Sequence, residues 1–224
     1  MLKGPSADPM TDAPFIVLEG IDGAGTTTQT ALLAAALRAK KTPVHTTREP
    51  SDGPIGVLIR QVLTGRLVAP CDGGGGPLGW ETMAALFAAD RLDHIQSEIA
   101  PALRNGITVI SDRYDVSSVA YQGVVSEDPT VFPWIRALNA RARRPDLTVV
   151  LDVSPAVARA RRRARAGRPE ILDADALQAR LADFYRAIES HFPDDRVVHV
   201  DGDGDVDAVH AAVLAAVEAI RARR

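Results

Sequence analysis

The stretch from Phe15 to Thr28, FIVLEGIDGAGTTT, decides the fold of this chain. It opens with a mainly apolar run, Phe15 to Glu19, that a glycine follows, and this pattern predicts a short buried strand. From Thr27 to Lys41 apolar residues recur at helical spacing, and Pro43 marks the end of the predicted helix. A strand, a glycine-rich turn and a helix in this order are the structural context of a phosphate-binding P-loop.

The turn from Gly20 to Thr27 follows the P-loop spacing except at one position. Its glycines would let backbone N–H groups curl around phosphates, and the helix that begins there adds the positive end of its dipole. The Thr27 hydroxyl stands where the motif has its Mg²⁺ ligand, but Thr26 stands in the position of the lysine. A structural glycine-rich turn therefore remains the alternative. The residues expected to bind donor phosphates are Gly20, Asp22, Gly23, Ala24, Gly25, Thr26, Thr27 and Thr28.

The remainder of the chain alternates between predicted strands and helices. Because parallel strands need crossover connections, this alternation predicts an α/β fold, with a five-stranded parallel sheet covered by helices on both faces. Further strands are expected at 44–47, 107–111, 147–152 and 197–201.

Other segments of the chain have weaker signals. Gly65 to Gly79 contains four consecutive glycines and is expected to be a loop. A long helix over 81–104 should be interrupted or bent near Pro101, and the last helix carries an apolar stripe from Val206 to Ile220. We expect a single domain over 14–224, preceded by a flexible tail over 1–13.

The bulk composition excludes several classes of partner. The chain has 224 residues, 46% of them hydrophobic, and a net charge of -3, whereas nucleic acids and membrane surfaces select basic proteins. It has no apolar run long enough to span a membrane and a single cysteine, Cys71, so we expect a cytoplasmic protein without nucleic-acid or membrane partners. Lysine occurs only at Lys3, Lys40 and Lys41, so 23 of the 26 basic residues are arginine.

Three further groups of residues fit a site that binds a second phosphate. Arg48-Glu49-Pro50 follows the second strand, Phe87 to Arg91 lies in the long helix, and Asp112-Arg113-Tyr114 follows the third strand. Ligands of such sheets bind beyond the carboxyl ends of the strands, where Arg48, Asp112 and Arg113 should meet the P-loop. The fork of an arginine suits bidentate binding of a phosphate.

These motifs, in their order from Glu19 to Asp152, resemble the thymidylate kinase family. The quoted residues are EGIDGAG, REP, FAADR, DRYDVSSVAYQ and PDLTVVLD, and the Arg-rich segment that follows resembles the mobile lid of the family, here around 159–171. The resemblance implies a three-layer P-loop kinase fold and transfer of phosphate from ATP to dTMP with Mg²⁺. It also implies a homodimer.

The resemblance assigns roles to the residues of the acceptor site. Arg91 and Arg113 should hold the phosphate of dTMP, Phe87 should stack on the thymine, Gln122 should read the base edge, and Tyr121 should lie near the 2′ position of the sugar. Asp22 is expected near the 3′-hydroxyl, and Arg48 and Ser118 complete the dTMP set.

Each of these roles has a structural alternative. Phe87 could be a core residue of its helix, and Arg91 could form a surface ion pair with Asp90 or Asp93. Asp22 could stabilise its own turn, and Asp112, the second expected metal ligand beside Thr27, could merely pair with an arginine. Ser117 and Ser118 could be helix caps.

The missing lysine adds a question about catalysis. An arginine of the lid or Arg48 is expected to supply the absent charge, so the catalytic candidates are Arg48, Asp112, Arg163, Arg165 and Arg168. Two other functions remain open. One is a kinase for another deoxynucleotide, and the other is a catalytically impaired nucleotide-binding protein, which the threonine at position 26 suggests.

Overall fold

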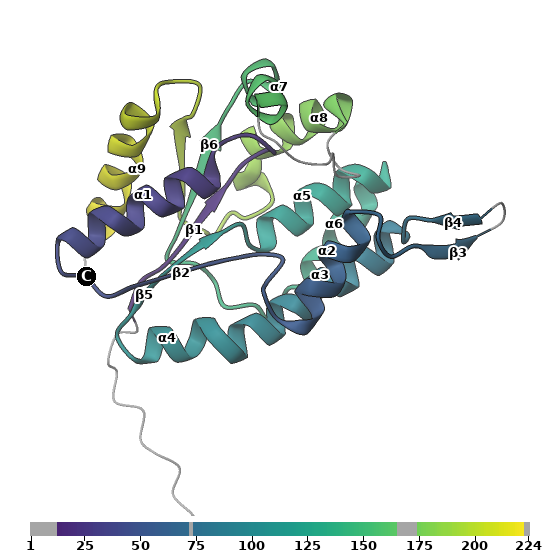
Figure 1. The fold of residues 1–224 in the computed structure, drawn as a ribbon, viewed down its shortest axis with the longest axis horizontal. Coiled ribbons are helices and arrows are strands. Elements are labelled where there is room, and N and C mark those ends of the chain that lie inside the picture. Colours follow the sequence, from purple (N-terminus) through teal and green to yellow (C-terminus); the bar gives the residue numbers. More distant parts are fainter. Residues whose placement is uncertain (1–12, 72–73, 165–173, 222–224) are drawn as a thin grey trace, which may run out of the picture.

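The computed structural model describes residues 13–71, 74–164 and 174–221. Its main sheet is parallel, with the strand order β2-β5-β1-β6-β7 (Figure 1). The strands are β1 Phe15–Glu19, β2 Val44–Arg48, β5 Thr108–Asp112, β6 Leu147–Asp152 and β7 Val197–Asp201. The predicted five-stranded parallel sheet is thereby confirmed.

Helices cover both faces of this sheet, as the three-layer prediction requires. One face carries α1 (Thr26–Ala39) and α9 (Val206–Arg221), which pack against each other, and α4, α5 and α8 lie on the other (Figure 1). The remaining bounds are α2 Pro54–Leu63, α3 Trp80–His94, α4 Ala100–Arg104, α5 Asp115–Ser126, α6 Phe132–Leu138, α7 Pro155–Ala164 and α8 Asp175–Arg186. Two short 3₁₀ turns span Pro129–Val131 and Ile188–Ser190.

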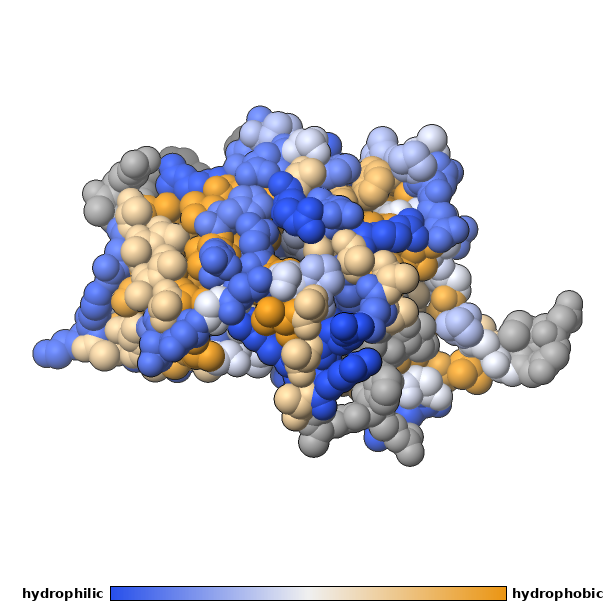
Figure 2. All heavy atoms as spheres, turned by 90° about the horizontal axis from the view of Figure 1, so that it is seen from above, coloured by the Kyte–Doolittle hydropathy of each residue, from blue (hydrophilic) through white to orange (hydrophobic). Residues whose placement is uncertain are grey.

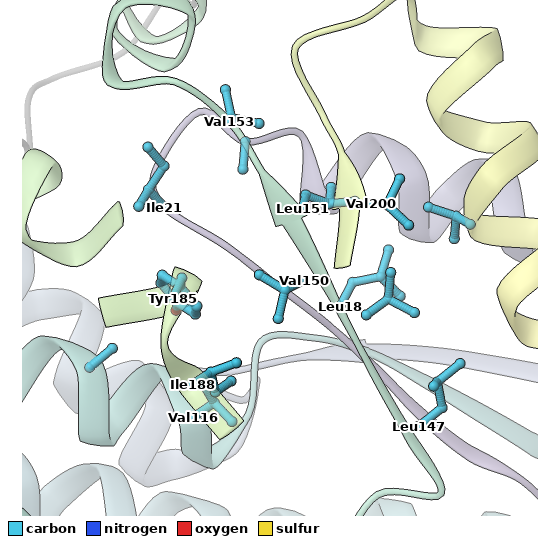
Figure 3. Close-up of a cluster of buried hydrophobic side chains, with 14 of the residues drawn as sticks. Leu18, Ile21, Val116, Leu147, Val150, Leu151, Val153, Tyr185, Ile188 and Val200 are labelled. Carbon is cyan, nitrogen blue, oxygen red and sulfur yellow. The ribbon is translucent and has the colours of Figure 1, made fainter. Parts of the chain in front are cut away.

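Strand β1 lies at the centre of the sheet and of the core. It pairs with β5 along one edge and with β6 along the other, and none of its side chains is exposed. Figure 3 shows Leu18 of β1 among side chains of β6 and β7, with Val116 of α5 and Tyr185 and Ile188 nearby. An apolar strand paired on both edges satisfies its backbone hydrogen bonds inside the protein, which explains why a continuous apolar run suits this position.

The apolar stripe of the last helix is confirmed except at its first residue. Val209, Val213, Val217 and Ile220 are buried, whereas Val206 is half exposed. Val206 is the first residue of α9, so its side chain lies at the end of the helix and not over the sheet.

The expected loop at 65–79 contains a short hairpin, and this part of the prediction was wrong. β3 (Ala69–Cys71) pairs with β4 (Gly74–Gly76) in antiparallel register, and the hairpin projects from the body beside α2 and α3 (Figure 1). Glycine is disfavoured in strands, so the sequence carries no strand signal there. At Gly75 an added Cβ would lie 2.4 Å from the Val68 side chain, so the absence of a side chain is what lets the chain approach Val68 so closely.

The long helix is interrupted before Pro101 and not at it. α3 passes into a π-helical turn, Ile95–Ile99, and α4 resumes with Pro101 in its first turn. Proline lacks the N–H that would bond to the carbonyl four residues earlier, and its ring crowds that carbonyl. A wider π turn just before the proline relieves this crowding, so the predicted interruption near Pro101 is confirmed.

Two predicted segments extend beyond the described residues. Most of the expected tail, 1–12, lies outside them, and the Ala13 N–H donates a 3.3 Å hydrogen bond to the Leu103 carbonyl. Of the expected lid, residues 159–164 form the end of α7, and 165–171 lie outside the described residues. Among the helices that the structure describes, none combines the length and the apolarity that crossing a membrane requires.

Glu19, the last residue of β1, is a completely buried carboxylate that joins three elements. It accepts hydrogen bonds from the Tyr114 and Ser117 N–H groups at 2.8 and 3.2 Å, and from the Ser117 and Tyr185 hydroxyls at 2.6 and 3.0 Å. Burial raises its pKa to about 7, against the Arg113 charge and these hydrogen bonds, which lower it. Glu19 therefore ties the end of β1 to α5 and α8 directly below the P-loop.

This raised pKa makes stability depend on pH. Because the pKa of Glu19 is higher in the folded chain than its ordinary value near 4.5, folding favours the protonated form. The contribution is complete below about pH 4.5, is lost as the pH rises through about 7, and amounts to about 3 kcal/mol. Urea unfolding should therefore show the free energy of unfolding of the wild type falling relative to that of Glu19→Gln over this range.

The control is Glu127→Gln, because the Glu127 side chain is 76% exposed. The difference in free energy of unfolding between Glu127→Gln and the wild type should stay constant over this pH range. If wild type and Glu19→Gln show parallel pH profiles, the assignment of this titration to Glu19 is wrong.

Candidate active site

A single cavity of about 680 Å³ opens at the carboxyl edge of the sheet and reaches from the P-loop to α3 and α5. It brings together nearly all of the predicted site residues that are described. Those that line it are Asp22, Gly23, Ala24, Gly25, Thr26, Thr27, Thr28, Arg48, Phe87, Arg91, Asp112, Arg113, Ser118, Tyr121 and Gln122. Gly20 lies beneath the loop, where an added Cβ would be 2.9 Å from the Ala24 Cβ.

The loop between β1 and α1 has the backbone that phosphate binding needs. Gly23 and Gly25 have φ values of 91° and 99°, in the left-handed region that favours glycine. α1 begins at Thr26 without a side-chain cap, so the N–H groups of its first turn have no capping partner. Such N–H groups and the helix dipole together attract an anion.

Thr27 and Asp112 meet at the start of α1 and the end of β5. The Thr27 hydroxyl donates a 2.5 Å hydrogen bond to Asp112 Oδ2, and Asp112 Oδ1 is buried without a hydrogen-bond partner among the described residues. Within the described ranges Asp112 thus has no arginine partner of the kind that its structural alternative required. A hydroxyl and a carboxylate with a spare oxygen are the donors that Mg²⁺ prefers, so this pair fits the ion.

Asp22 and Arg113 form a charged pair between the P-loop and the end of β5. Arg113 Nη2 lies 2.5 Å from Asp22 Oδ1, and its Nη1 donates to the Gly20 carbonyl at 2.9 Å. Gln178 of α8 holds Asp22 on its other side, since its amide donates to Asp22 Oδ2 at 2.8 Å and accepts from the Asp22 N–H at 2.9 Å. Asp22 therefore orients Arg113 and does not merely stabilise its own turn.

Gln178 was missed by sequence reasoning. It lies 156 residues after Asp22, on a helix whose pattern shows only amphipathic packing, and it is completely buried. A glutamine without a motif around it carries no signal for this contact.

Arg91 is buried deep in the cavity, and its expected surface alternative was wrong. Only 1% of its side chain is exposed, and it forms an ion pair of 2.5 Å with Glu49. It also donates to the Ser118 hydroxyl at 3.0 Å and to the Asn139 side chain, and its guanidinium lies over the Tyr114 ring. Its Nε has no hydrogen-bond partner among the described residues.

Neither Glu49 nor its partner His94 was predicted as a site residue. Besides Arg91, Glu49 contacts the buried His94, whose other ring nitrogen bonds to the Thr47 hydroxyl at 2.7 Å. Asp90 does not pair with Arg91 but accepts hydrogen bonds from the Ser51 N–H and hydroxyl. Both carboxylates hold the segment after β2 against α3, and these contacts between residues 39 to 45 positions apart leave no pattern in the sequence.

The side chains expected around a base occupy the same half of the cavity. Phe87 lines the cavity and also packs against the apolar cluster of α2, so it belongs to the core and at the same time faces the cavity. Tyr121 is nearly buried, with the Arg113 guanidinium 5.3 Å from its ring centre. Gln122 is 4% exposed, and its Oε1 has no hydrogen-bond partner within the described ranges.

Arg48 and the two serines complete this half. The Arg48 side chain is 60% exposed and pairs with Asp52 at 2.9 Å, so it stands at the mouth of the cavity. Ser118 bonds to Arg91, and Ser117, which was left out of the predicted site, bonds to Glu19 and to Arg113 at 3.1 Å. Neither serine is merely a helix cap.

Among the lid residues that the structure describes, the arginines that reach the cavity differ from the predicted Arg163. Arg161 and Arg162 line the cavity, whereas Arg163 is exposed and does not, and Arg165 and Arg168 lie outside the described residues. Successive residues of a helix turn by about 100°, so three consecutive arginines cannot all face the loop. The sequence marks the run of arginines but not the side of the helix that meets the P-loop.

The face of the molecule above the sheet is mainly hydrophilic. Figure 2, which looks down on Figure 1, shows polar and charged residues over its middle with hydrophobic residues scattered between them. A surface of this kind suits a charged ligand better than an apolar one.

The thymidylate kinase family model matches residues 18–213 of this chain. The chain is 40% identical over 205 residues to a protein named probable thymidylate kinase from Thermococcus gammatolerans, across 91% of this chain and 95% of that relative. It is also 40% identical over 212 residues to a protein named thymidylate kinase from Nitrobacter winogradskyi, across 90% and 86% of the two chains. With this match over most of its length, the chain belongs to the thymidylate kinase family.

Proposed function

We propose that this chain transfers the γ-phosphate of ATP to dTMP, giving ADP and dTDP. The observation that carries the proposal is that one cavity joins a P-loop to an Asp22–Arg113 pair and to Phe87 and Gln122. A kinase for nucleoside monophosphates needs these two halves in one space, because the two anionic nucleotides must meet end to end.

The acceptor half supplies one group for each part of dTMP. Arg113, oriented by Asp22, meets the phosphate, with Arg48 at the mouth and Arg91 reaching the nucleotide through its unpartnered Nε. Phe87 stacks on the thymine, and the free Oε1 of Gln122 accepts a hydrogen bond from the base. Ser118 holds Arg91, Tyr121 limits the space beside the sugar, and Asp22 lies near the 3′-hydroxyl.

The donor half consists of the loop from Gly20 to Thr28 and the start of α1. Its N–H groups bind the donor phosphates, and Thr27 and Asp112 would hold Mg²⁺, which neutralises charge on these phosphates when it is bound. The protein then aligns an oxygen of the acceptor phosphate with the γ-phosphorus, and no covalent intermediate with a side chain is needed. The lid arginines, Arg163, Arg165 and Arg168 among them, belong to the segment that excludes water from this transfer.

Thr26 favours a second candidate function, a protein that binds nucleotides but turns them over poorly. The lysine of the P-loop neutralises charge on the donor phosphates, and threonine cannot. A kinase that prefers another deoxynucleotide is the other alternative. Acceptor tests separate all three.

We expect dTMP to be the best acceptor, with ribonucleotides at least about tenfold poorer in kcat/KM, because Tyr121 narrows the sugar site and Phe87 and Gln122 fit thymine. The measurement is coupled ADP release with ATP, Mg²⁺ and dTMP, dUMP, CMP, UMP or AMP. Thr27→Ala, purified in the same way, controls for contaminating kinases and should be nearly inactive. Faster turnover of CMP, UMP or AMP refutes the assignment, and binding without turnover favours the impaired protein.

A second prediction separates recognition of phosphate from recognition of the base. Arg113→Gln should weaken dTMP binding by about 1.5–3 kcal/mol, the value of a hydrogen bond to a charged group, because it removes the positive charge of the phosphate site. Thymidine has no phosphate, so its affinity should not change. Titration calorimetry with both ligands makes the comparison, with the exposed Arg136→Gln as a control. An equal loss for dTMP and thymidine would contradict the role given to Arg113.

We further propose that the enzyme is a cytoplasmic homodimer that pairs through α2 and the base of the hairpin. Val57, Leu58, Leu67 and Val68 are 44%, 38%, 43% and 49% exposed, and Figure 2 shows hydrophobic residues where the hairpin leaves the body. Exposed apolar side chains gathered in this way favour a protein partner over water.

Light scattering during size exclusion should give twice the 23.9 kDa chain mass for the wild type. Val57→Asp should shift the protein to the monomer, because it buries a charge in the apolar contact. Val125→Asp, on α5 and similarly exposed at 39%, is the matched control and should remain dimeric. A monomeric wild type, or dimers of both variants, would remove this proposal.

A further inference from the structure

The donor half of the cavity has no lysine in the part of the chain that the structure describes. Thr26 occupies the lysine position and is 6% exposed. Lys40 and Lys41 follow the far end of α1, about 20 Å from the loop at 1.5 Å per residue, and Lys40 pairs with Glu218. Among the described residues, a positively charged side chain at the donor phosphates must therefore be an arginine.

Helix α7 lies directly against the P-loop. A Cβ at Gly23 would stand 2.4 Å from the Ala158 carbonyl oxygen and 3.0 Å from Arg162 Cγ. Gly23 thus allows the backbone of α7 to touch the loop, and the two arginines that follow Ala158 by three and four residues face the loop on this side.

Arg162 fixes α7 to the loop. Its Nη1 donates to the Asp22 carbonyl at 2.7 Å, and its Nη2 donates to Asp175 Oδ1 at 2.8 Å. The Arg162 side chain is only 9% exposed, and Asp175 at the start of α8 neutralises its charge. Through these contacts Arg162 holds the P-loop, α7 and α8 together.

Arg161, unlike Arg162, donates its hydrogen bonds to backbone carbonyls and to no carboxylate that the structure describes. Its Nη1 and Nη2 donate to the Ala24 and Gly204 carbonyls, both at 3.3 Å, and no carboxylate among the described residues lies within ion-pair distance. These bonds are longer than the usual 2.9 Å and lead to neutral acceptors. The guanidinium therefore keeps its net charge at the end of the cavity that Gly202, Gly204 and Val206 line.

The other arginines of the cavity are already paired with carboxylates. Arg48 pairs with Asp52 at 2.9 Å, Arg91 with Glu49 at 2.5 Å and Arg113 with Asp22 at 2.5 Å. All three line the acceptor half, at or beyond the carboxyl ends of β2 and β5. Within the described part of the chain, Arg161 is thus the arginine that the geometry leaves for the donor.

We propose that Arg161 takes the place of the missing P-loop lysine at the donor phosphates, and that Arg162 positions it by anchoring α7. This proposal assumes one part of the proposed function, namely that the P-loop binds a nucleoside triphosphate. When the donor enters, Arg161 exchanges its long bonds to neutral carbonyls for charge-assisted bonds to phosphate oxygens, which are shorter and stronger. Thr26 is tolerated because the charge comes from the other side of the loop.

The test measures binding of MgATP and of adenosine by titration calorimetry, without any acceptor. Arg161→Ala should weaken MgATP binding at least about tenfold, the loss of a charge-assisted contact, and leave adenosine binding unchanged. Arg159→Ala removes an exposed arginine from the same helix and should match the wild type. Arg163→Ala serves as the comparison within the arginine run.

A rescue variant distinguishes replacement of the lysine from general loss of charge. Thr26→Lys combined with Arg161→Ala should regain most of the lost MgATP affinity, whereas Thr26→Lys in the wild type should add less. Arg162→Ala should weaken MgATP binding, and Thr26→Lys should restore that variant too, since the anchor acts through Arg161. Thermal unfolding verifies that each variant folds. If the variants with Thr26→Lys do not fold, the MgATP affinity of Arg161→Ala by itself decides the proposal.

Two results would overturn the proposal: unchanged MgATP binding by Arg161→Ala, or an equal loss of adenosine binding. A larger loss with Arg163→Ala than with Arg161→Ala would assign the role to the predicted residue. None of these measurements involves dTMP. A wild type that binds MgATP but fails to phosphorylate dTMP would refute the proposed function and leave the inference on Arg161 standing.

Discussion

Strand β1 is completely buried at the centre of the sheet, and this burial fixes the position of the P-loop that follows it. The strand is paired on both edges and enclosed on both faces, so its last residue, Glu19, cannot shift without breaking contacts to α5 and α8. The P-loop therefore leaves the sheet from a fixed point. Its left-handed glycines turn the chain back into α1 at once, so the first turn of α1, which has no side-chain cap, begins at the wall of the cavity.

Charge in this site is arranged in pairs that tie distant segments together. Arg91 with Glu49 joins α3 to the segment after β2, and Arg113 with Asp22 joins β5 to the P-loop. A buried guanidinium without a partner would cost several kcal/mol, so each pair also limits where its two elements can lie. The pairs prepare the acceptor half without a ligand, and in the donor half Arg161 keeps a charge that no described carboxylate neutralises.

Asp22 is the meeting point of both halves. Its carboxylate receives Arg113 and Gln178, and its backbone carbonyl receives Arg162. One residue of the P-loop thus contacts Arg113 after β5, α8 through Gln178 and α7 through Arg162. A displacement of α7 or α8 would act on Asp22 directly, and through it on the position of the Arg113 guanidinium.

Much of this molecule follows from local pattern. The five strands, the P-loop and the apolar stripe of α9 were all predicted, because burial of one strand or one helix face leaves a periodic record in the sequence. The grouping of Arg48, Asp112 and Arg113 was predicted as well, since the carboxyl ends of parallel strands meet at one edge. The hairpin at Ala69–Gly76 was not, because its glycines pair through the backbone alone.

The order of residues along the chain is enough to specify the sheet, the P-loop and the family to which the chain belongs. The partners of the site residues, by contrast, follow from the packing of the whole fold. Gln178 meets Asp22 across 156 residues, Glu49 neutralises Arg91, and Arg161 and not Arg163 faces the P-loop. The reason is physical: a strand or helix is specified by neighbours within a few residues, whereas the direction of a side chain into a cavity depends on how whole elements pack.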